Sequence, residues 1–253
     1  MPLIQANGLA FHVQTLGAGP PVVMIHGLFL GNLATWYFTA APAIARRHHV
    51  LLYDLRGHGR SATAPTGYDL ATMGADLLAI LDGAGVTEPA DLVGHSYGGL
   101  IALRLALEAP HRVRRLALVE APLPPASLGA LDTYLETDPQ DYLRAVPASL
   151  RRTTIRTTGR RVRRTRAALE SRRDDTTLVA DLRAEPDFDD AALARLPHPA
   201  LCLYGVRSAC RPAGDRLARV LPQARLVELD GGHMLPTECP AELTRTLVEF
   251  LDG

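Results

Sequence analysis

Two short stretches of the chain contain the residue types of a nucleophilic serine site. In the first, residues 94–99 read GHSYGG, which satisfies the G-x-S-x-G pattern between an apolar run and the helix-forming sequence LIALRLALEA. A strand that turns abruptly into a helix strains the residue at its apex, and flanking glycines leave room for that turn. The pattern predicts that Ser96 holds its hydroxyl above a sheet, at the positive end of a helix.

The second stretch, DGGHMLPTE, places His233 in a loop after another apolar run. Histidine is well suited to take a proton from a serine, because its ordinary pKa is close to neutrality. His233 also comes after Ser96 in the chain, in the order found in one class of serine hydrolase. We therefore expect Ser96 to be a nucleophile and His233 its general base.

A loop that could stabilise negative charge opens where the strand-like run VVMIH is followed by GLFLG, over residues 22–31. The backbone N–H of Leu28 in that loop and the N–H of Tyr97, next to the nucleophile, would form a two-donor oxyanion hole. Each such donor lowers the activation barrier by about 3 kcal/mol. We interpret His26 as a histidine that stabilises the turn rather than as a base.

Short apolar runs alternate along the chain with longer stretches of helical periodicity. The central runs are continuously apolar, as in strands buried on both faces, and such alternation is typical of an α/β fold with a mostly parallel sheet covered by helices. The expected strands are residues 9–16, 21–26, 49–54, 90–95, 115–120, 200–205 and 224–229, and the expected helices are 34–47, 69–84, 97–109, 212–221 and 240–251.

Residues 122–197 interrupt this alternation, because they contain no strand-like run. The proline-rich sequences APLPPAS and RLPHPA at the two ends of this region suit hinges. Between them, Leu128, Leu131 and Leu135 fall at helical spacing, and the stretch at 167–185 also has a helical pattern. We expect residues 1–121 and 198–253 to form the core, and residues 122–197 to form a helical lid.

With these motifs, the chain resembles proteins of the α/β-hydrolase fold over essentially its whole length. The resemblance rests on HGLF, YDLRGHGRS, GHSYGG and GGHMLPTECPAEL. It implies an eight-stranded sheet, Ser96 as nucleophile, His233 as base and a lid inserted after the sixth strand. Most such proteins also carry an aspartate after the next strand, but CLYGVRSACRP at 202–212 has no carboxylate, and Ser208 stands at or beside the usual position.

The histidine must then take its carboxylate from elsewhere, because a hydroxyl cannot supply the charge that stabilises an imidazolium. Loss of that charge costs about 10⁴ in turnover. Four candidates fit this role poorly. Asp54 lies in a turn that we interpret as structural, and Asp91 lies at the wrong edge of the sheet. Asp215 lies inside an expected helix, and Asp230 is too close in sequence to the histidine.

Glu120 is the fifth candidate. It ends the run RLALVE, so it lies at the carboxyl edge of the strand beside the nucleophile, where catalytic groups of open α/β sheets gather. Some α/β hydrolases place their acid at this position. We predict a Ser96–His233–Glu120 triad, and the alternative is that Glu120 caps an element or forms an ion pair near the lid hinge.

The bulk composition excludes several classes of protein. The 253-residue chain is 47% hydrophobic and 21% charged, as in a soluble globular protein, and its 27 basic and 27 acidic residues predict no nucleic-acid or membrane partner. Cys202, Cys210 and Cys239 are too few and too scattered for a disulfide framework or a zinc site, so we expect no metal and no cofactor. No apolar run approaches the roughly 20 residues of a membrane span, and the first residues lack a secretory leader pattern, which favours the cytoplasm.

Two features bear on the ligand. Residues 151–173 carry ten arginines and one acid, Glu170. They could form a solvated helix face, could pair with the acidic stretch at 136–141, or could dock an anionic partner such as an acyl carrier protein or a coenzyme A thioester. Side chains that could line an apolar acyl pocket, with ordinary core packing as the alternative, are Phe29, Trp36, Tyr97, Tyr134, Tyr142 and Met234.

Together these features favour a cofactor-free hydrolase of a carboxylic ester, lactone or thioester that works through an acyl-enzyme. Two alternatives use the same scaffold. One is a polyketide-type cyclase, an acyltransferase or a carbon–carbon hydrolase, and the other is a non-catalytic ligand-binding protein. Because position 96 is serine and not aspartate, halide displacement and epoxide hydrolysis are not expected.

Overall fold

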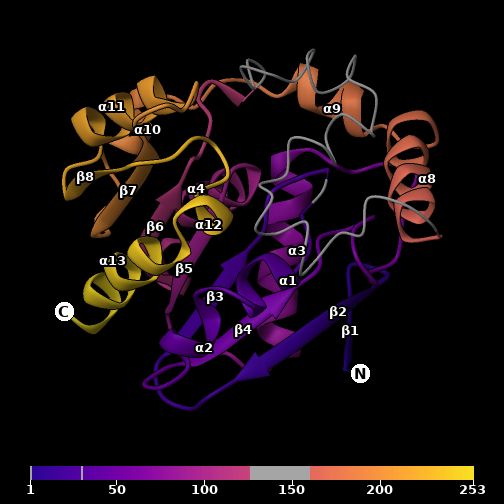
Figure 1. Ribbon diagram of the computed structural model, residues 1–253, viewed down its shortest axis with the longest axis horizontal. Helices are drawn as coiled ribbons and strands as arrows, with labels where there is room; N and C mark the ends of the chain where they lie inside the picture. Colours follow the sequence, from indigo (N-terminus) through magenta and orange to yellow (C-terminus); the bar gives the residue numbers. More distant parts are fainter. Residues whose placement is uncertain (1, 30, 126–159) are drawn as a thin grey trace.

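The computed structural model describes residues 2–29, 31–125 and 160–253, with the backbone alone for 160–166. In this part of the chain, an eight-stranded sheet has the order β1-β2-β4-β3-β5-β6-β7-β8 (Figure 1). The strands are β1 Leu3–Ala6, β2 Leu9–Leu16, β3 Pro21–Ile25, β4 His49–Tyr53, β5 Ala90–His95, β6 Val113–Val119, β7 Ala200–Gly205 and β8 Ala224–Leu229. The first two pairings are antiparallel and the other five are parallel, which confirms the predicted α/β class.

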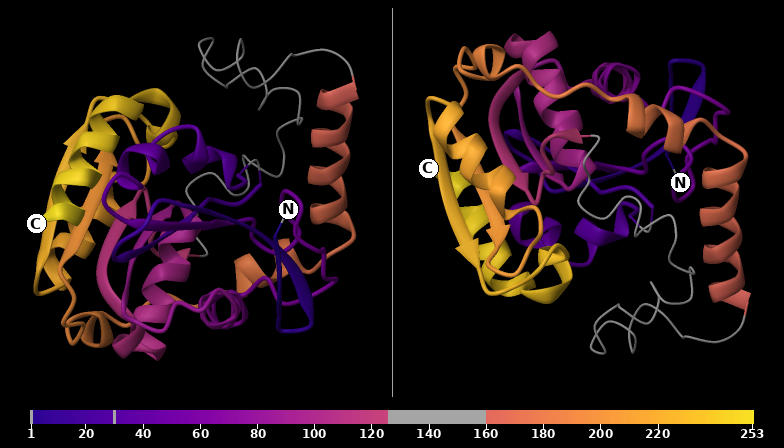
Figure 2. Two further views of the ribbon diagram at one scale, coloured as in Figure 1. Left: turned by 90° about the horizontal axis from the view of Figure 1, so that it is seen from below. Right: turned by 90° about the horizontal axis from the view of Figure 1, so that it is seen from above.

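Helices cover both faces of the sheet (Figure 2). One buried cluster joins the sheet to α3 (Leu70–Gly83), α4 (Tyr97–Glu108) and α11 (Arg211–Val220). The other joins it to α1 (Ala34–Tyr37), α2 (Ala41–Ile44), α12 (Leu235–Glu238) and α13 (Pro240–Asp252). A short 3₁₀ helix, Pro110–Arg112, connects α4 to β6. Among the described residues, none of the helices combines the length and the apolar character needed to cross a bilayer.

Two expected helices are each divided in the structure. The segment expected as one helix at 34–47 forms α1 and α2, and Pro42 lies in the first turn of α2. Proline has no N–H to donate to the preceding turn, so it begins a new helix more readily than it continues an old one. The helical stretch at 167–185 likewise forms the end of α8 (Arg160–Asp174) and α9 (Leu178–Ala184), with a break at 175–177.

The segment expected to form a lid leaves the sheet after Val119 and returns at Ala200. Its described part contains α8, α9 and α10 (Asp190–Leu193), and α8 lies at the end of the molecule opposite to α13 (Figure 2). Leu128, Leu131 and Leu135 lie outside the described residues. The division into a core and a lid therefore stays a proposal.

Buried polar contacts attach α8 and α9 to the loops of the sheet. The Arg172 guanidinium donates to the carbonyl oxygens of Gly57, at 2.9 Å, and Phe29, at 2.6 Å. The carboxylate of Glu185, just after α9, accepts from the backbone N–H of Leu70 at 2.9 Å. Both side chains are largely buried, so these bonds fix α8 and α9 against the loops after β3 and β4 and against the start of α3.

A buried ion pair joins the turn after β4 to α3. The guanidinium of Arg56 donates two hydrogen bonds, both of 2.7 Å, to the carboxylate of Asp76, and it also donates to the carbonyl of Thr66 at 3.1 Å. Both charged side chains are about 5% exposed or less. Removal of one partner would leave the other charge desolvated and unpaired.

We expect Asp76→Ala to lower the free energy of unfolding by about 3–5 kcal/mol, because Arg56 stays buried without a counter-charge. The matched control is Asp215→Ala, which breaks the exposed pair of Asp215 with Arg211 and should change the stability far less, because solvent screens that pair. Urea denaturation followed by circular dichroism measures both changes. Equal losses in the two variants would contradict the structural role of the buried pair.

Candidate active site

Ser96 lies at the sharp turn between β5 and α4. Its φ of 54° and ψ of −125° fall outside the regions that residues with a side chain readily adopt, which is a form of strain that concentrates at active sites. The turn also needs glycine on both sides. A Cβ at Gly94 would lie 2.3 Å from the carbonyl oxygen of Gly98, and a Cβ at Gly98 would lie 2.6 Å from that of Ile25.

His233 lies in the loop between β8 and α12, and that loop is fixed by its own hydrogen bonds. The carboxylate of Glu238 accepts from the N–H groups of Gly232, at 2.6 Å, and Met234, at 3.3 Å. The His95 ring nitrogen Nε2 contacts the carbonyl oxygen of His233 at 2.8 Å. Burial, reinforced by His233, lowers the pKa of His95 to about 3, so His95 is neutral and donates this bond.

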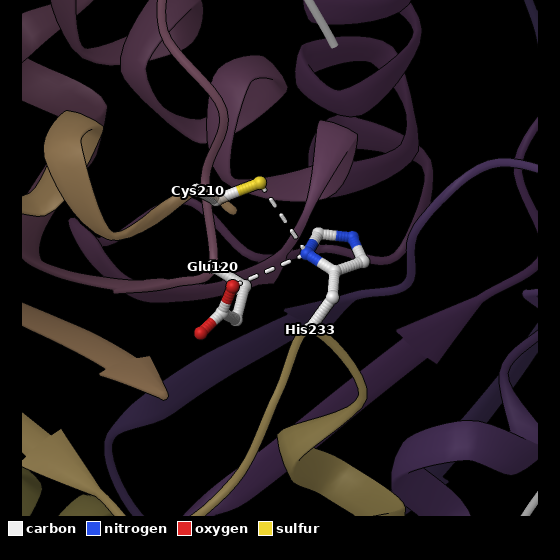
Figure 3. Close-up of side chains that lie close together, drawn as sticks. All are labelled: Glu120, Cys210 and His233. Atoms are coloured by element: carbon white, nitrogen blue, oxygen red, sulfur yellow. Dashed lines mark hydrogen bonds and ion pairs between the residues drawn. The ribbon is translucent and has the colours of Figure 1, made fainter. Parts of the chain in front are cut away.

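The imidazole of His233 connects the serine to a carboxylate. Its Nε2 lies 3.0 Å from the Oγ of Ser96, and its Nδ1 lies 3.2 Å from Oε2 of Glu120 (Figure 3). Glu120 directly follows β6 and its side chain is fully buried. The structure thus brings the three residues of the expected triad into one hydrogen-bonded line. Their catalytic roles are taken up below as a proposal.

Both oxygens of the Glu120 carboxylate accept hydrogen bonds from the end of β7 and the turn after it. Its Oε1 accepts from the N–H of Gly205, and its Oε2 accepts from the hydroxyl of Ser208. The backbone N–H of Cys210 donates to the same hydroxyl at 3.0 Å. Ser208 is therefore a hydrogen-bond donor to the acid, and it stands where the family resemblance leads one to expect the acid itself.

Cys210 forms a second contact to the histidine. Its Sγ lies 3.5 Å from Nδ1 of His233, the same nitrogen that faces Glu120 (Figure 3). Burial by itself would lower the pKa of His233, but the hydrogen bonds and charges of Cys210 and Glu120 outweigh burial and raise this pKa to about 9. The site therefore stabilises the imidazolium form strongly.

The other four carboxylates considered from the sequence are each engaged elsewhere. Asp54 accepts hydrogen bonds from the His12 ring at 2.8 Å and from the backbone N–H of Leu33 at 2.8 Å, which agrees with a structural role in its turn. The remaining three form ion pairs with arginines: Asp91 with Arg114, Asp215 with Arg211, and Asp230 with Arg207.

Of the two expected oxyanion donors, Tyr97 directly follows Ser96 in the chain, and Leu28 lies in a loop that approaches Ser96 in space. Tyr97 is the first residue of α4, and its ring is buried with the hydroxyl donating to the carbonyl of Tyr68 at 3.0 Å. Leu28 is half-buried in the loop after β3. In that loop, a Cβ at Gly27 would lie 3.0 Å from Cβ of Ser96, so this part of the backbone lies close to the Ser96 side chain.

His26 stabilises the same loop, as interpreted from the sequence. One ring nitrogen contacts the carbonyl of Gly27 at 2.7 Å, and the other accepts from the N–H of Leu55 at 3.0 Å. Burial lowers the pKa of His26 to about 4. The ring is therefore neutral, and it ties the loop after β3 to the turn after β4.

The side chains expected to line an acyl pocket have different positions. Trp36 is fully buried in the core, where its ring N–H donates to the carbonyl of Ile25 at 3.0 Å. Phe29, in the loop after β3, and Met234, in the loop that carries His233, are half-buried, and Phe29 has a φ of 64°. Tyr134 and Tyr142 lie outside the described residues.

Comparison with known proteins identifies the fold. The family model described as the alpha/beta hydrolase fold matches residues 20–194. The chain belongs to the α/β-hydrolase fold family. A solved hydrolase from Pseudomonas aeruginosa PA01 superimposes on this α/β hydrolase with a TM-score of 0.79 at 29% identity, covering 100% of this chain and 98% of the other.

Named relatives of this α/β hydrolase include a carbamate hydrolase, RutD, of Pseudomonas savastanoi pv. phaseolicola, 32% identical over 92% of this chain and 94% of that protein. A pimeloyl-[acyl-carrier protein] methyl ester esterase of Chromobacterium violaceum is 34% identical over 95% of this chain and 97% of that protein. The chain also spans 64% of the length of a Pseudomonas putida dihydrolipoyllysine-residue acetyltransferase component of an acetoin cleaving system, at 32% identity.

Two residues of the site were not found from the sequence. Cys210 was counted only as one of three scattered cysteines, although it lies two positions after Ser208 in the turn that lacks the usual acid. His95, which directly precedes Ser96, fixes the carbonyl of His233. The only sequence signal for Cys210 was its place in this turn, and the turn by itself does not say which of its side chains face His233.

We expect the imidazole of His233 to titrate with a pKa well above the ordinary value of about 6.5, so that it stays protonated to higher pH than a free histidine. Cys210→Ala and Glu120→Gln should each lower this pKa, because each removes a group that stabilises the cation. Carbon-13 NMR of the ring measures the titration, and Cys239→Ala is the control that should leave it unchanged. A pKa at or below the ordinary value in the unaltered protein would contradict this electrostatic description.

Proposed function

We propose that this α/β hydrolase is a cofactor-free serine hydrolase that cleaves a carboxylic ester, thioester or lactone through Ser96, His233 and Glu120. One observation carries the proposal, namely the continuous line in which the imidazole lies 3.0 Å from the serine hydroxyl and 3.2 Å from a buried carboxylate. A serine hydroxyl is a weak nucleophile by itself, and it is activated by an adjacent base that a third group orients.

In the proposed first step, Oγ of Ser96 attacks the substrate carbonyl carbon while its proton passes to Nε2 of His233. Glu120 stabilises the imidazolium that forms, and the N–H groups of Leu28 and Tyr97 stabilise the oxyanion. The tetrahedral intermediate then collapses, and the leaving oxygen or sulfur takes the proton from Nε2. Water, activated by the same base, hydrolyses the acyl-enzyme and releases the acid.

The named relatives support a carbonyl substrate. One is named for a carbamate and another for the methyl ester of a carrier-bound acyl chain. Both groups have a carbonyl carbon with a heteroatom leaving group, which is the electrophile that an activated serine attacks. Phe29 and Met234, half-buried beside the two loops of the site, are suitably placed to contact an acyl chain.

The arginine-rich segment supports an anionic carrier, such as an acyl carrier protein or coenzyme A, as the second part of the proposal. Of its ten arginines, the structure describes the side chains of Arg172 and Arg173. Arg172 is buried and bound to carbonyl oxygens of the core, and Arg173 pairs with Asp174. These two are engaged within the chain, so we assign docking to the arginines at 151–166.

We expect a fluorophosphonate probe to label Ser96 in the folded protein, and Ser96→Ala to lower turnover by about 10⁶ on the best ester, thioester, lactone or carbamate of a panel. The loss follows from removal of the atom that forms the acyl-enzyme. Mass spectrometry of the labelled peptide and steady-state kinetics measure the two effects. Absence of labelling in folded protein would favour the non-catalytic alternative, and labelling with turnover only of a cyclising substrate would favour a cyclase.

We expect Glu120→Gln to lower kcat by about 10⁴, because the amide cannot stabilise the imidazolium. Adding Ser208→Asp to that variant should restore part of the activity, since position 208 already contacts the carboxylate that faces the histidine. Asp230→Asn, which removes an exposed carboxylate three residues before His233, is the control and should change kcat little. Full activity of Glu120→Gln would show that another group serves as the acid.

A further inference from the structure

Three side chains that can each ligate a metal ion lie close together on the Nδ1 side of the His233 ring (Figure 3). They are the carboxylate of Glu120, the thiol of Cys210 and the imidazole of His233 itself. They come from the end of β6, the residue before α11 and the loop after β8, so their proximity is produced by the sheet and not by sequence spacing. One ligand atom from each lies within 4.8 Å of the other two. We propose that this cluster is a Zn²⁺ site, and that Zn²⁺ bound there switches the hydrolase off.

Two of the three separations within the cluster match a zinc coordination shell. For tetrahedral zinc with ordinary bond lengths, the ligand atoms of a histidine and a carboxylate lie about 3.3 Å apart, and those of a histidine and a cysteine about 3.6 Å apart. In the structure, Nδ1 of His233 lies 3.2 Å from Oε2 of Glu120 and 3.5 Å from Sγ of Cys210. The third separation, between Sγ of Cys210 and the Glu120 carboxylate, is within 4.8 Å, whereas tetrahedral zinc needs about 3.5 Å. Zinc binding therefore requires the Cys210 or Glu120 side chain to move toward the ion, while the spacing of each from His233 already fits.

The chemistry of the donors also fits zinc. A thiolate, an imidazole and a carboxylate together suit this borderline-soft cation, and the two negative charges balance its charge. Three protein ligands leave a fourth position for water. Glu120 is fully buried, but the His233 side chain is 27% exposed and Cys210 is half-buried, so the ion can enter from the solvent side.

Binding at Nδ1 would remove the base from catalysis. Zinc displaces the proton of the Cys210 thiol and, from the imidazolium, the proton on Nδ1, and both protons pass to solvent. Zinc then takes the lone pair of Nδ1, and the neutral imidazole keeps its one proton on Nε2. Nε2 then donates to the Oγ of Ser96 and cannot accept its proton. Glu120 is at the same time drawn to the metal. The inhibition, although not the binding, rests on the proposed serine-hydrolase function.

The other two free cysteines provide a contrast within the chain. Cys202 is fully buried, and burial raises the pKa of its thiol to about 12. Cys239 is half-buried like Cys210, but its thiol contacts the carbonyl of Leu235 at 3.7 Å. Burial and then the nearby Glu242 raise the pKa of Cys239 to about 11. Cys239→Ser is therefore the matched control for Cys210→Ser.

The binding experiment uses the full chain, freed of metals by a chelator and kept reduced, and titrated with ZnCl₂ in a calorimeter. We expect one Zn²⁺ per chain in the unaltered protein, in Cys239→Ser and in Ser96→Ala. Cys210→Ser should weaken binding by about 100-fold or more, since even loss of a residue that only supports a ligand costs 10–100-fold. Co²⁺ in place of Zn²⁺ should give a thiolate charge-transfer absorption band that Cys210→Ser abolishes.

Two results would overturn the site: no Zn²⁺ uptake at large excess of metal, or equal affinity in the unaltered protein and Cys210→Ser. Because Ser96→Ala tests binding without catalysis, failure of the proposed hydrolase mechanism would leave this result intact. If Cys210→Ser does not fold, protection of one thiol from alkylation by Zn²⁺ in the unaltered protein supports the site, and absence of protection contradicts it.

The inhibition experiment measures ester hydrolysis against Zn²⁺ concentration, with each variant compared to its own metal-free rate. We expect inhibition that a chelator reverses in the unaltered protein and in Cys239→Ser, at the concentrations where the metal binds. Cys210→Ser should need about 100-fold more Zn²⁺ for the same fractional loss, in line with its weaker binding. Activation by Zn²⁺, or equal inhibition of Cys210→Ser, would overturn the inhibitory role.

Discussion

The arrangement of the site depends on a carboxylate buried where no solvent reaches it. A buried carboxylate costs several kcal/mol unless hydrogen bonds and a counter-charge satisfy its oxygens. Glu120 obtains these from the N–H of Gly205, the hydroxyl of Ser208 and the ring of His233. These partners lie at the end of β7, in the turn after it and in the loop after β8, so the ends of three neighbouring parallel strands must converge on one side chain. The hydrogen bonds of Glu120 therefore form only when those strands pair in the observed register.

The sheet also stabilises two residues with a strained backbone, each directly after a strand. Ser96 and Glu120 end adjacent strands, and both have positive φ, 54° and 56°. The N–H of Ser96 donates to the carbonyl of Val119 at 2.8 Å, and the N–H of Glu120 donates to that of Leu203 at 2.9 Å. Each strained residue is thus hydrogen-bonded to the neighbouring strand. Such conformations persist only where the surroundings determine them fully, and here parallel pairing does so.

Much of this framework could be predicted from the sequence, because the information is local. Short runs rich in apolar residues gave the bounds of β5, β7 and β8 correctly. β5 and β7 are buried along their whole length, which requires mostly apolar residues, whereas β8 is an edge strand and is only partly buried. β1 (Leu3–Ala6) was missed, because it is short and partly exposed and has no such run. The division into α1 and α2 could have been read from Pro42, whose effect on helices is also local.

The sequence could predict only those parts of the site whose position follows from the order of the strands in the sheet. Strands that end at the same edge place Ser96 and Glu120 near one another, and the same rule excludes Asp91, which lies at the other edge. The place of Cys210 beside the imidazole depends instead on the path of the turn between β7 and α11. Spacing along the chain carries no such information, which is why scattered cysteines were a poor guide to metal ligands.

The same groups that make His233 a stabilised cation limit it as a base. Serine attack requires an unprotonated Nε2, yet Cys210 and Glu120 raise the pKa of the ring to about 9. A carboxylate behind the imidazole favours the imidazolium that forms in the transition state, and it favours the protonated resting state as well. The thiol and the carboxylate stabilise any cation bound at Nδ1, whether it is a proton or a metal ion. Competition between them for one nitrogen follows directly from the placement of a thiol and a carboxylate on the same side of the ring.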